Sequence, residues 1–281
     1  MLKRINFLTA GESHGKGLLG IIDGIPSNLI LEKEYIDKEL KRRQMGYGRG
    51  GRMKIESDEV EIWSGVRHGK TIASPIGLIV KNKDWENWKS KMSIKIPPKA
   101  PKKVTLPRPG HADLAGVEKY GFDDIRNVLE RSSARETAMR VALASVCRKL
   151  LKDLGIEIAS RVIRIHDIKD ESQIDVNINN IDLNKRADES PVRCLNKSAE
   201  KDMVKVIDNA KARGDSVGGV FEIIATGLPH GLGSYVQWDR KLQAKISSLL
   251  MSVNAFKAIE IGSGFLSGEK FGSEIHDEIE W

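Results

Sequence analysis

The sequence predicts an α+β fold that contains an internal duplication. Segments rich in Ile, Val and Leu predict strands, and segments with a helical spacing of apolar residues predict helices. A motif near the N-terminus, Gly11-Glu-Ser-His-Gly15, returns 203 residues later as Gly214-Asp-Ser-Val-Gly218. Both copies lead to a similar tripeptide at the same offset, Gly24-Ile-Pro26 and Gly227-Leu-Pro229. Repeats this far apart predict two related half-domains rather than a solenoid, and chance likeness of glycine-rich turns is the alternative.

The predicted elements follow one another along the whole chain. Strands are expected at residues 5–10, 18–23, 60–64, 76–81, 156–165, 220–226 and 258–261. Helices are expected at residues 32–43, 134–154, 199–212 and 239–253. Ser133 and Glu136 have the spacing of a capping box before the second helix, and Gly155 is its expected stop. Asp239 is the expected N-cap of the last helix.

Composition excludes several classes of protein. The chain has 281 residues, of which 40% are hydrophobic and 30% charged, which is typical of globular proteins and not of disordered ones. No apolar run approaches the ~20 residues of a membrane helix, and the N-terminus lacks the apolar stretch of a signal peptide. Two cysteines are too few for a disulfide framework or a zinc site, so we expect no metal, no membrane partner and a cytoplasmic location.

Positive charge is concentrated in the first part of the chain. Residues 1–112 contain 22 Lys and Arg against 12 Asp and Glu, whereas residues 113–281 contain 24 against 27. Residues 95–109 alone hold five of the nine prolines and five basic residues, which predicts an irregular basic loop. This asymmetry indicates an anionic ligand for the first part of the chain, or alternatively a solvated basic face.

Arginines in two kinds of setting predict a site for an anion. Glycines let backbone N–H groups curl around an anion, and the start of a helix favours phosphate. The two groups are Arg42, Arg43, Arg49 and Arg52 around a loop with four glycines, and Arg131, Ser132, Ser133 and Arg135 at a predicted helix start. Guanidinium groups bind phosphate and carboxylate in a bidentate manner, so these groups together predict a ligand with several negative charges.

Two histidines are candidates for proton transfer. His14 and His111 lie in glycine-flanked turns beside the acidic residues Glu12 and Asp113. Histidine has the side-chain pKa nearest to neutral pH, which suits proton transfer, although a turn histidine with a purely structural hydrogen bond is the alternative. The second copy of the repeat has Val217 in place of His14, which favours a chemical role for His14. The paired Trp85 and Trp88 are interpreted as part of a surface flap or subunit contact.

Five segments of the chain resemble the signature segments of the chorismate synthase family, in the same order and spacing. They are Thr9-Ala-Gly-Glu-Ser-His-Gly15, Arg108-Pro-Gly-His-Ala-Asp113, Arg131-Ser-Ser-Ala-Arg-Glu-Thr-Ala138, Gly214-Asp-Ser-Val-Gly218 and Met251-Ser-Val-Asn-Ala-Phe256. The resemblance covers residues 1–281 and implies an anti-1,4-elimination of phosphate from 5-enolpyruvylshikimate 3-phosphate, which gives chorismate. It also implies reduced FMN without net redox change, a β-α-β sandwich with an internal duplication, and a homotetramer.

The resemblance also implies roles for individual residues. His14 would protonate the leaving phosphate, and His111 would donate a proton to the reduced flavin. Arg43, Arg49 and Arg135 would bind the small anionic substrate. The segments implied to contact FMN contain Arg131, Ser132 and Ser133, and Asn254 and Ala255. Whether NADPH reduces the flavin on this protein, or an external flavin reductase supplies it, stays open.

Members of the family continue beyond the position of Trp281, so the sequence predicts a single domain with halves of about 1–155 and 156–281, the second cut short. From this we expect weak FMN binding and little turnover for residues 1–281 alone. Two other classes of function stay open from the sequence. They are an inactive paralogue that serves as an assembly partner, and a protein that binds nucleic acid through its basic first part, although no nucleic-acid partner is expected.

Overall fold

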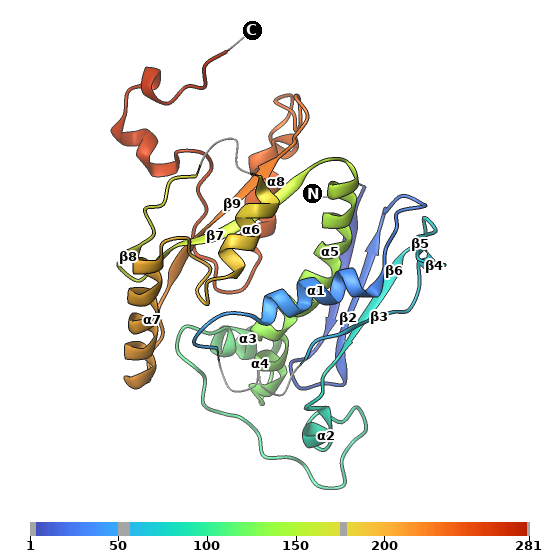
Figure 1. Ribbon diagram of the computed structural model, residues 1–281. Helices are drawn as coiled ribbons and strands as arrows, with labels where there is room; N and C mark the ends of the chain where they lie inside the picture. Colours follow the sequence, from blue (N-terminus) through green and yellow to red (C-terminus); the bar gives the residue numbers. More distant parts are fainter. Residues whose placement is uncertain (1–3, 50–56, 175–178, 280–281) are drawn as a thin grey trace. The chain divides into compact units, whose positions relative to one another are not determined.

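The computed structural model describes residues 4–49, 57–174 and 179–279 (Figure 1). Arg4–Leu228 form one compact unit, and Pro229–Trp281 belong to a second, smaller unit. The protein contains both helices and sheets, as the sequence predicts, and its sheets are antiparallel. Among the helices of the described residues, none combines the length and apolar character needed to cross a membrane.

The first sheet has four strands in the order β1-β2-β6-β3, and every neighbouring pair is antiparallel. Its strands are β1 (Asn6–Gly11), β2 (Gly17–Asp23), β6 (Ile76–Lys81) and β3 (Val60–Ile62). A short hairpin of β4 (Val66–Arg67) and β5 (Lys70–Thr71) lies between β3 and β6 in the chain. Helices α1 (Lys33–Gln44) and α5 (Thr137–Asp153) cover one face of this sheet.

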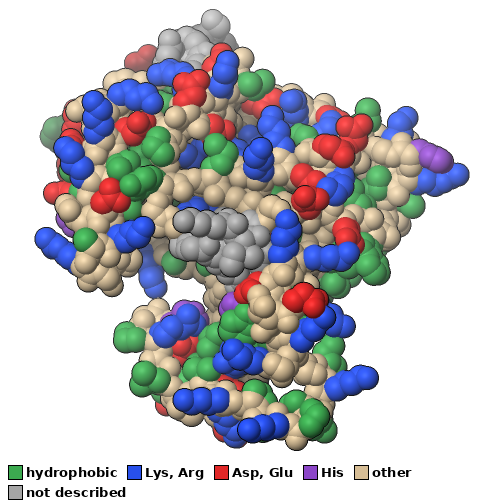
Figure 2. All heavy atoms as spheres, turned by 60° about the horizontal axis from the view of Figure 1, so that its bottom comes forward, with side chains coloured by type: hydrophobic (Ala, Val, Ile, Leu, Met, Phe, Trp, Pro, Cys, Tyr) green, Lys and Arg blue, Asp and Glu red, His purple; other side chains and the backbone are tan. Residues whose placement is uncertain are grey.

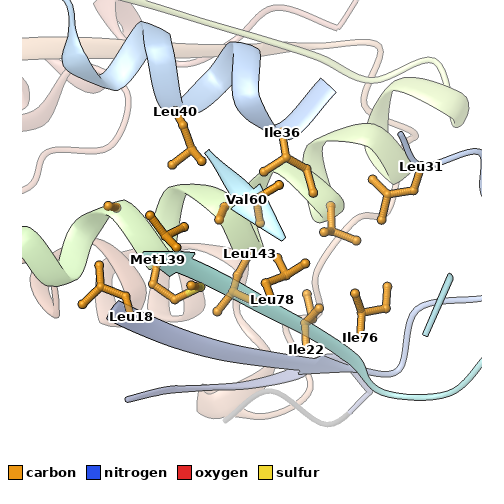
Figure 3. Packing of buried hydrophobic residues seen from close by; sticks show 14 of the residues in the cluster. Leu18, Ile22, Leu31, Ile36, Leu40, Val60, Ile76, Leu78, Met139 and Leu143 are labelled. Atoms are coloured by element: carbon orange, nitrogen blue, oxygen red, sulfur yellow. The ribbon is translucent and has the colours of Figure 1, made fainter. Parts of the chain in front are cut away.

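The main hydrophobic core lies between this sheet and the two helices (Figure 3). The alternation of side chains along a strand sends Leu18 and Ile22 of β2 inward, where both are about 1% exposed. Met139 and Leu143, one turn apart on α5, pack against the same face. Gly20 permits this close packing, because a Cβ there would lie 2.4 Å from the Met139 sulfur.

The second sheet has three strands in the order β8-β7-β9, again antiparallel. Its strands are β7 (Glu157–Ile165), β8 (Ile168–Lys169) and β9 (Gly219–Thr226). Helix α6 (Asn180–Asp188) packs on β7, where the Asn180 amide donates to the carbonyls of Glu157 and Ile224. Helix α7 (Lys197–Ala212) covers β8, and Met203 is fully buried in a second, smaller core.

Three short helices complete the larger unit, and short helices dominate the smaller one. The former are α2 (Trp85–Trp88), α3 (Asp113–Tyr120) and α4 (Arg126–Arg131), with the 3₁₀ turn η2 (Ala134–Glu136) leading into α5. The smaller unit contains η3 (Trp238–Arg240), α8 (Leu242–Met251), η4 (Gly264–Glu269) and η5 (Gly272–Glu274). Helices α2, α3, α4 and α6 were not predicted from the sequence.

Six of the seven predicted strands are confirmed within a few residues, and one is wrong. Residues 258–261 have no regular secondary structure, and the described part of their unit contains no strand that could accept their ladder hydrogen bonds. The four predicted helices are confirmed, as is the irregular loop at 95–109. Asp239 does not cap α8, because it lies inside η3 and the helix begins two residues after Arg240.

The capping box predicted at Ser133 is present only in part. The Ser133 hydroxyl accepts from the Arg135 N–H at 3.3 Å, as a cap does. The Glu136 side chain does not turn back to Ser133; it accepts from Thr9 and Arg140 instead. Gly155 ends α5 as predicted, with the positive φ of 79° that glycine adopts readily.

The β1–β2 pair and the β7–β9 pair are built alike at one end. Asn6 faces Asp23 where the first pair closes, and Glu157 faces Thr226 in the second. Gly24 and Gly227 then follow with φ of 89° and 74°. A Cβ on Gly24 would lie 1.8 Å from the Arg4 oxygen, and one on Gly227 would lie 2.2 Å from the Gly155 oxygen. The glycines of the two tripeptides, Gly24 and Gly227, therefore occupy similar positions after the end of a strand pair.

Candidate functional site

His14 lies in the turn between β1 and β2, which we call the His14 turn (residues 12–16), and a buried carboxylate holds it there. The Glu130 side chain of α4 is 1% exposed, and both its oxygens lie 2.9 Å from His14 Nδ1. The His14 backbone N–H donates to Glu130 Oε2 at 2.8 Å, and the Ser13 N–H donates to the Glu130 carbonyl at 3.0 Å. The imidazole is therefore fixed at Nδ1, while one fifth of the side chain reaches solvent.

An aromatic ring packs on the face of the same imidazole. Trp88 of α2 stacks on His14 with ring centroids 3.8 Å apart and planes 23° apart. The Trp88 indole N–H donates to Asp84 at 2.8 Å, which fixes the ring. Two cations lie over the Trp88 ring, Lys91 at 4.6 Å and Arg126 at 5.4 Å. Trp88 therefore belongs to the surroundings of His14, which goes beyond the surface flap expected from the sequence.

His111 also has a carboxylate partner, which here comes from Asp113, two residues further along the chain. His111 Nδ1 lies 2.6 Å from Oδ1 of Asp113, whose side chain is 1% exposed. Burial raises the pKa of Asp113, but hydrogen bonds from the Arg108 side chain and backbone and from His111 outweigh this and lower the pKa to about 2. Asp113 is thus ionised at neutral pH, and its carboxylate accepts from His111 and Arg108 together.

The elements that carry the two histidines' partners pack against each other. Asp113 begins α3, and Glu130 lies near the end of α4. Gly116 of α3 lets the helices approach, because a Cβ there would lie 2.5 Å from a Val128 methyl group on α4. Both histidine–carboxylate pairs are therefore anchored on one helical framework.

Arg43 and Arg135 meet at a buried carboxylate, Asp58, whose side chain is fully buried. Arg135 Nη1 lies 2.5 Å from Asp58 Oδ1, and Arg43 Nη1 lies 3.5 Å from Oδ2. Burial lowers the pKa of Arg43; Asp58 opposes this, and the cations Arg135 and Arg49 add to it. We call Arg43, Arg49, Arg135 and Asp58 the arginine cluster. Arg43 and Arg135 share its one carboxylate, and Arg49 lies near enough to lower the pKa of Arg43, so the cluster carries excess positive charge.

Asn82 joins the arginine cluster to the His14 turn. Its amide donates to the carbonyls of Glu12 and Gly15 at 3.1 and 2.8 Å. Its side-chain oxygen accepts from Arg135 Nε at 3.0 Å, in a buried contact. The candidate acid His14 and the candidate anion-binding residues thus share one rigid hydrogen-bonded framework.

The residues implied to contact the cofactor lie in two places. Arg131 donates to the carbonyls of Gly11 and Thr9 at 3.0 and 2.9 Å, so it fastens the end of β1. The Ser132 hydroxyl donates to the Val128 carbonyl, and the Ser133 hydroxyl donates to Ser13. Asn254 and Ala255 form an exposed turn after α8, in the smaller unit.

Part of the glycine–arginine loop predicted from the sequence, including Arg52, lies outside the described residues. Within the described ranges, no group of three or more His, Cys, Asp or Glu is placed to hold a metal ion. Sequence reasoning missed Glu130, Asp58, Asn82 and the stacking role of Trp88. No local signal marks them, since Glu130 is 116 residues from His14 and Asp58 is 77 residues from Arg135.

Comparison with known proteins identifies the family. The family model for chorismate synthase matches residues 5–281. This chain belongs to the chorismate synthase family. A chorismate synthase of Alkaliphilus metalliredigens is 55% identical over 272 residues, which are 97% of this chain and 70% of that protein. One of Aquifex aeolicus is 51% identical over 287 residues, covering 100% of this chain and 72% of that protein.

A solved structure agrees with this assignment. A crystal structure of chorismate synthase superimposes with a TM-score of 0.84 at 43% sequence identity, over 100% of this chain and 76% of the other. The chain is therefore an enzyme of this family, and its activity is chorismate synthesis, a lyase reaction of the shikimate pathway. The family resemblance inferred from the five sequence segments is confirmed.

Proposed function

We propose that this chain eliminates phosphate from 5-enolpyruvylshikimate 3-phosphate at a site built from the His14 turn and the arginine cluster. The observation that carries this proposal is the Asn82 bridge, which links Arg135 to the turn that holds His14. The proposed substrate has one phosphate and two carboxylates, and the cluster has excess guanidinium charge beside an imidazole. Binding and proton transfer can therefore act on one ligand.

Arg43, Arg49 and Arg135 are proposed to bind the anionic groups of the substrate. Asp58 holds two of these guanidinium groups in place before the substrate arrives. Such preorganisation means that the groups need not be reoriented when the charge of the leaving phosphate develops. The limited exposure of Arg43 and Arg135, 15% and 6%, also places their charges in a medium that screens them less than water does.

His14 is proposed to protonate the departing phosphate from Nε2. An ionised carboxylate has only acceptors, so the Glu130 contact keeps the proton of a neutral imidazole on Nδ1. A second proton then occupies Nε2, from where it is available to a leaving oxygen. The stack on Trp88 holds the ring plane while this transfer takes place.

His111 is proposed to hold the second transferable proton. Asp113 fixes Nδ1 as the donor, so Nε2 is the nitrogen that would carry this proton. Arg108 Nη2 lies 3.2 Å from Nδ1 and 3.1 Å from Nε2, so the guanidinium group packs against the ring beside both nitrogens. The Arg108 side chain is 55% exposed, and it also donates to Asp113, so it helps to hold the carboxylate that orients His111.

Reduced FMN is proposed as the cofactor, on the basis of the family. When bound, it supplies electron density that helps phosphate to leave although no neighbouring carbonyl activates the C–H bond. The residues at this position are of types that bind an anionic, phosphate-bearing group. Arg131 is exposed and uses three of the five N–H donors of a guanidinium within the chain, and Ser132 and Ser133 lie beside it. Asn254 and Ala255 are the proposed contacts from the smaller unit.

The source of reducing equivalents is part of the same proposal. NADPH could reduce the flavin on this protein, or an external flavin reductase could supply it. Measuring NADPH oxidation by the purified protein with FMN distinguishes the two sources.

The finer architecture is proposed to be a β-α-β sandwich with an internal duplication, in one domain with halves near 1–155 and 156–281. Helix α5 supports the sandwich, because it packs on β2 and β6 while its Arg148 donates to the Ile158 carbonyl of β7. The matching Gly24 and Gly227 contacts support the duplication.

A homotetramer is proposed as well. The sheet face away from the main core is apolar, with Leu8, Leu19 and Ile21 exposed by 71%, 46% and 44%. An apolar sheet face of this kind suits burial against another copy of the chain. Light scattering coupled to size-exclusion chromatography tests this state.

The test of the proposed activity is an anaerobic assay with reduced FMN. Substrate should give chorismate and phosphate in equal amounts, without net oxidation of the flavin. Absence of phosphate release, or oxidation of one flavin per turnover, would overturn the proposal. Nucleic-acid binding is the weaker candidate, because basic and acidic side chains are interspersed on the face that Figure 2 shows.

A further inference from the structure

Both carboxylate oxygens of Glu130 contact the candidate acid His14. Its two oxygens are equidistant from His14 Nδ1 at 2.9 Å, and one of them also accepts the His14 backbone N–H. The carboxylate is 1% exposed, although a glutamate on a short helix would normally face water. Burying a charged group costs free energy unless the group is paired and hydrogen-bonded, and His14 supplies most of the partners of Glu130.

We propose that Glu130 is a positioning residue for the elimination: it fixes the tautomer and the orientation of His14 so that Nε2 faces the leaving group. This inference rests on the proposed role of His14. It adds a residue to the site that acts through the imidazole and does not itself touch the substrate. Trp88 supports the same role, because it stacks on the face of the imidazole ring that Glu130 holds through Nδ1, and so restricts its rotation. We call Glu130 and Trp88 the His14 clamp.

The charges around the His14 clamp support a positioning role. Arg126 Nη1 lies 3.6 Å from Glu130 Oε1, so the carboxylate is shared between a permanent cation and the imidazole. Arg126 also lies over the Trp88 ring, so this one cation contacts both residues of the His14 clamp. The carboxylate therefore keeps a compensating cation beside it when His14 is neutral, and its oxygens are placed to accept from Nδ1–H.

The test is a double-mutant cycle on chorismate formation. Glu130→Gln keeps the shape but offers an amide that can either donate to or accept from Nδ1, so the tautomer is no longer fixed. We expect kcat to fall at least about tenfold but by less than the ~10²–10⁴-fold that a general acid contributes as a whole, with KM for the substrate nearly unchanged. Glu130→Gln should cause no further loss in a His14→Ala background.

Two further variants keep the test decisive. Glu130→Asp retains the charge that balances Arg126 but withdraws the carboxylate from Nδ1, so it should fold and still lose kcat. Glu39→Gln is the matched control: Glu39 is a half-buried carboxylate that accepts from Arg148 at 2.8 Å, away from the site, and its kcat should be unchanged.

The outcomes separate this inference from the proposed function. A His14→Ala variant with full kcat would show that His14 is not the acid, and the role of Glu130 would fall with it. An inactive His14→Ala variant together with full kcat in both Glu130 variants would overturn the positioning role alone. An additional loss from Glu130→Gln in the His14→Ala background would also overturn it, because Glu130 would then act independently of His14.

Discussion

Asp58→Asn is the most informative change to the arginine cluster. The substitution keeps the size of the side chain but removes the one negative charge between Arg43 and Arg135. Asp58 is fully buried, and Arg135 beside it is 6% exposed, so neither guanidinium can recover full hydration in place. Removing one partner of a buried ion pair costs about 3–5 kcal/mol, because the remaining charge stays buried without compensation.

Urea unfolding followed by circular dichroism measures this cost. We expect the free energy of unfolding to fall by about 3–5 kcal/mol, a large part of the ~5–15 kcal/mol of a typical protein. Glu39→Gln is again the comparison, because its partners Arg148 and Arg42 are 27% and 19% exposed and can turn to water, so its loss should be smaller. A loss below about 1 kcal/mol for Asp58→Asn, or one no larger than that of Glu39→Gln, would refute the argument from burial.

Three other predictions concern Asp113, two glycines and Arg108. The pKa of Asp113 falls from 3.8 to about 2 on folding. Its contribution to the free energy of unfolding is therefore present above pH 4 and is lost as the pH falls toward 2. The gap in unfolding free energy between the protein and Asp113→Asn, about 2 kcal/mol, should close over that range; a constant gap contradicts this. Gly24→Ala and Gly227→Ala should each destabilise more than Gly69→Ala in urea unfolding, since all three have positive φ but only Gly69 has open space around a Cβ; equal losses would contradict this. Arg108→Gln should lower the free energy of unfolding at neutral pH by less than Asp113→Asn does, because the backbone N–H of residue 108 still donates to Asp113; an equal or larger loss in urea unfolding would contradict this.

The sequence predicted the strands and longer helices because their signals are local. The run of Leu and Ile in β2 is typical of a strand, and the spacing of Ile36 and Leu40 in α1 reflects the face that the helix buries. Residues 258–261 have the composition of a strand but no partner strand among the described residues of their unit, and composition cannot supply one. Helices of four to eight residues, such as α2, α3 and α4, are too short for a periodic pattern to stand out.

The candidate site was predictable as a set of residues but not as an arrangement. Asp113 could be paired with His111 from the sequence because it is two residues away. Glu12 is likewise two residues from His14 and was the apparent counterpart, yet Glu130 supplies the carboxylate from 116 residues further along. Arg131 illustrates a different limit: its motif implies a cofactor contact, while its hydrogen bonds in the structure fasten the end of β1.

The most direct test of the account is the rate of chorismate formation by His14→Ala and His111→Ala, measured anaerobically with reduced FMN and saturating substrate. Both variants should fold, bind substrate and lose about 10²-fold or more in kcat, because each removes one proton-transfer group and leaves the arginine cluster intact. If both variants kept the kcat of the unmodified protein, the central claim that these two histidines carry the chemistry would be wrong.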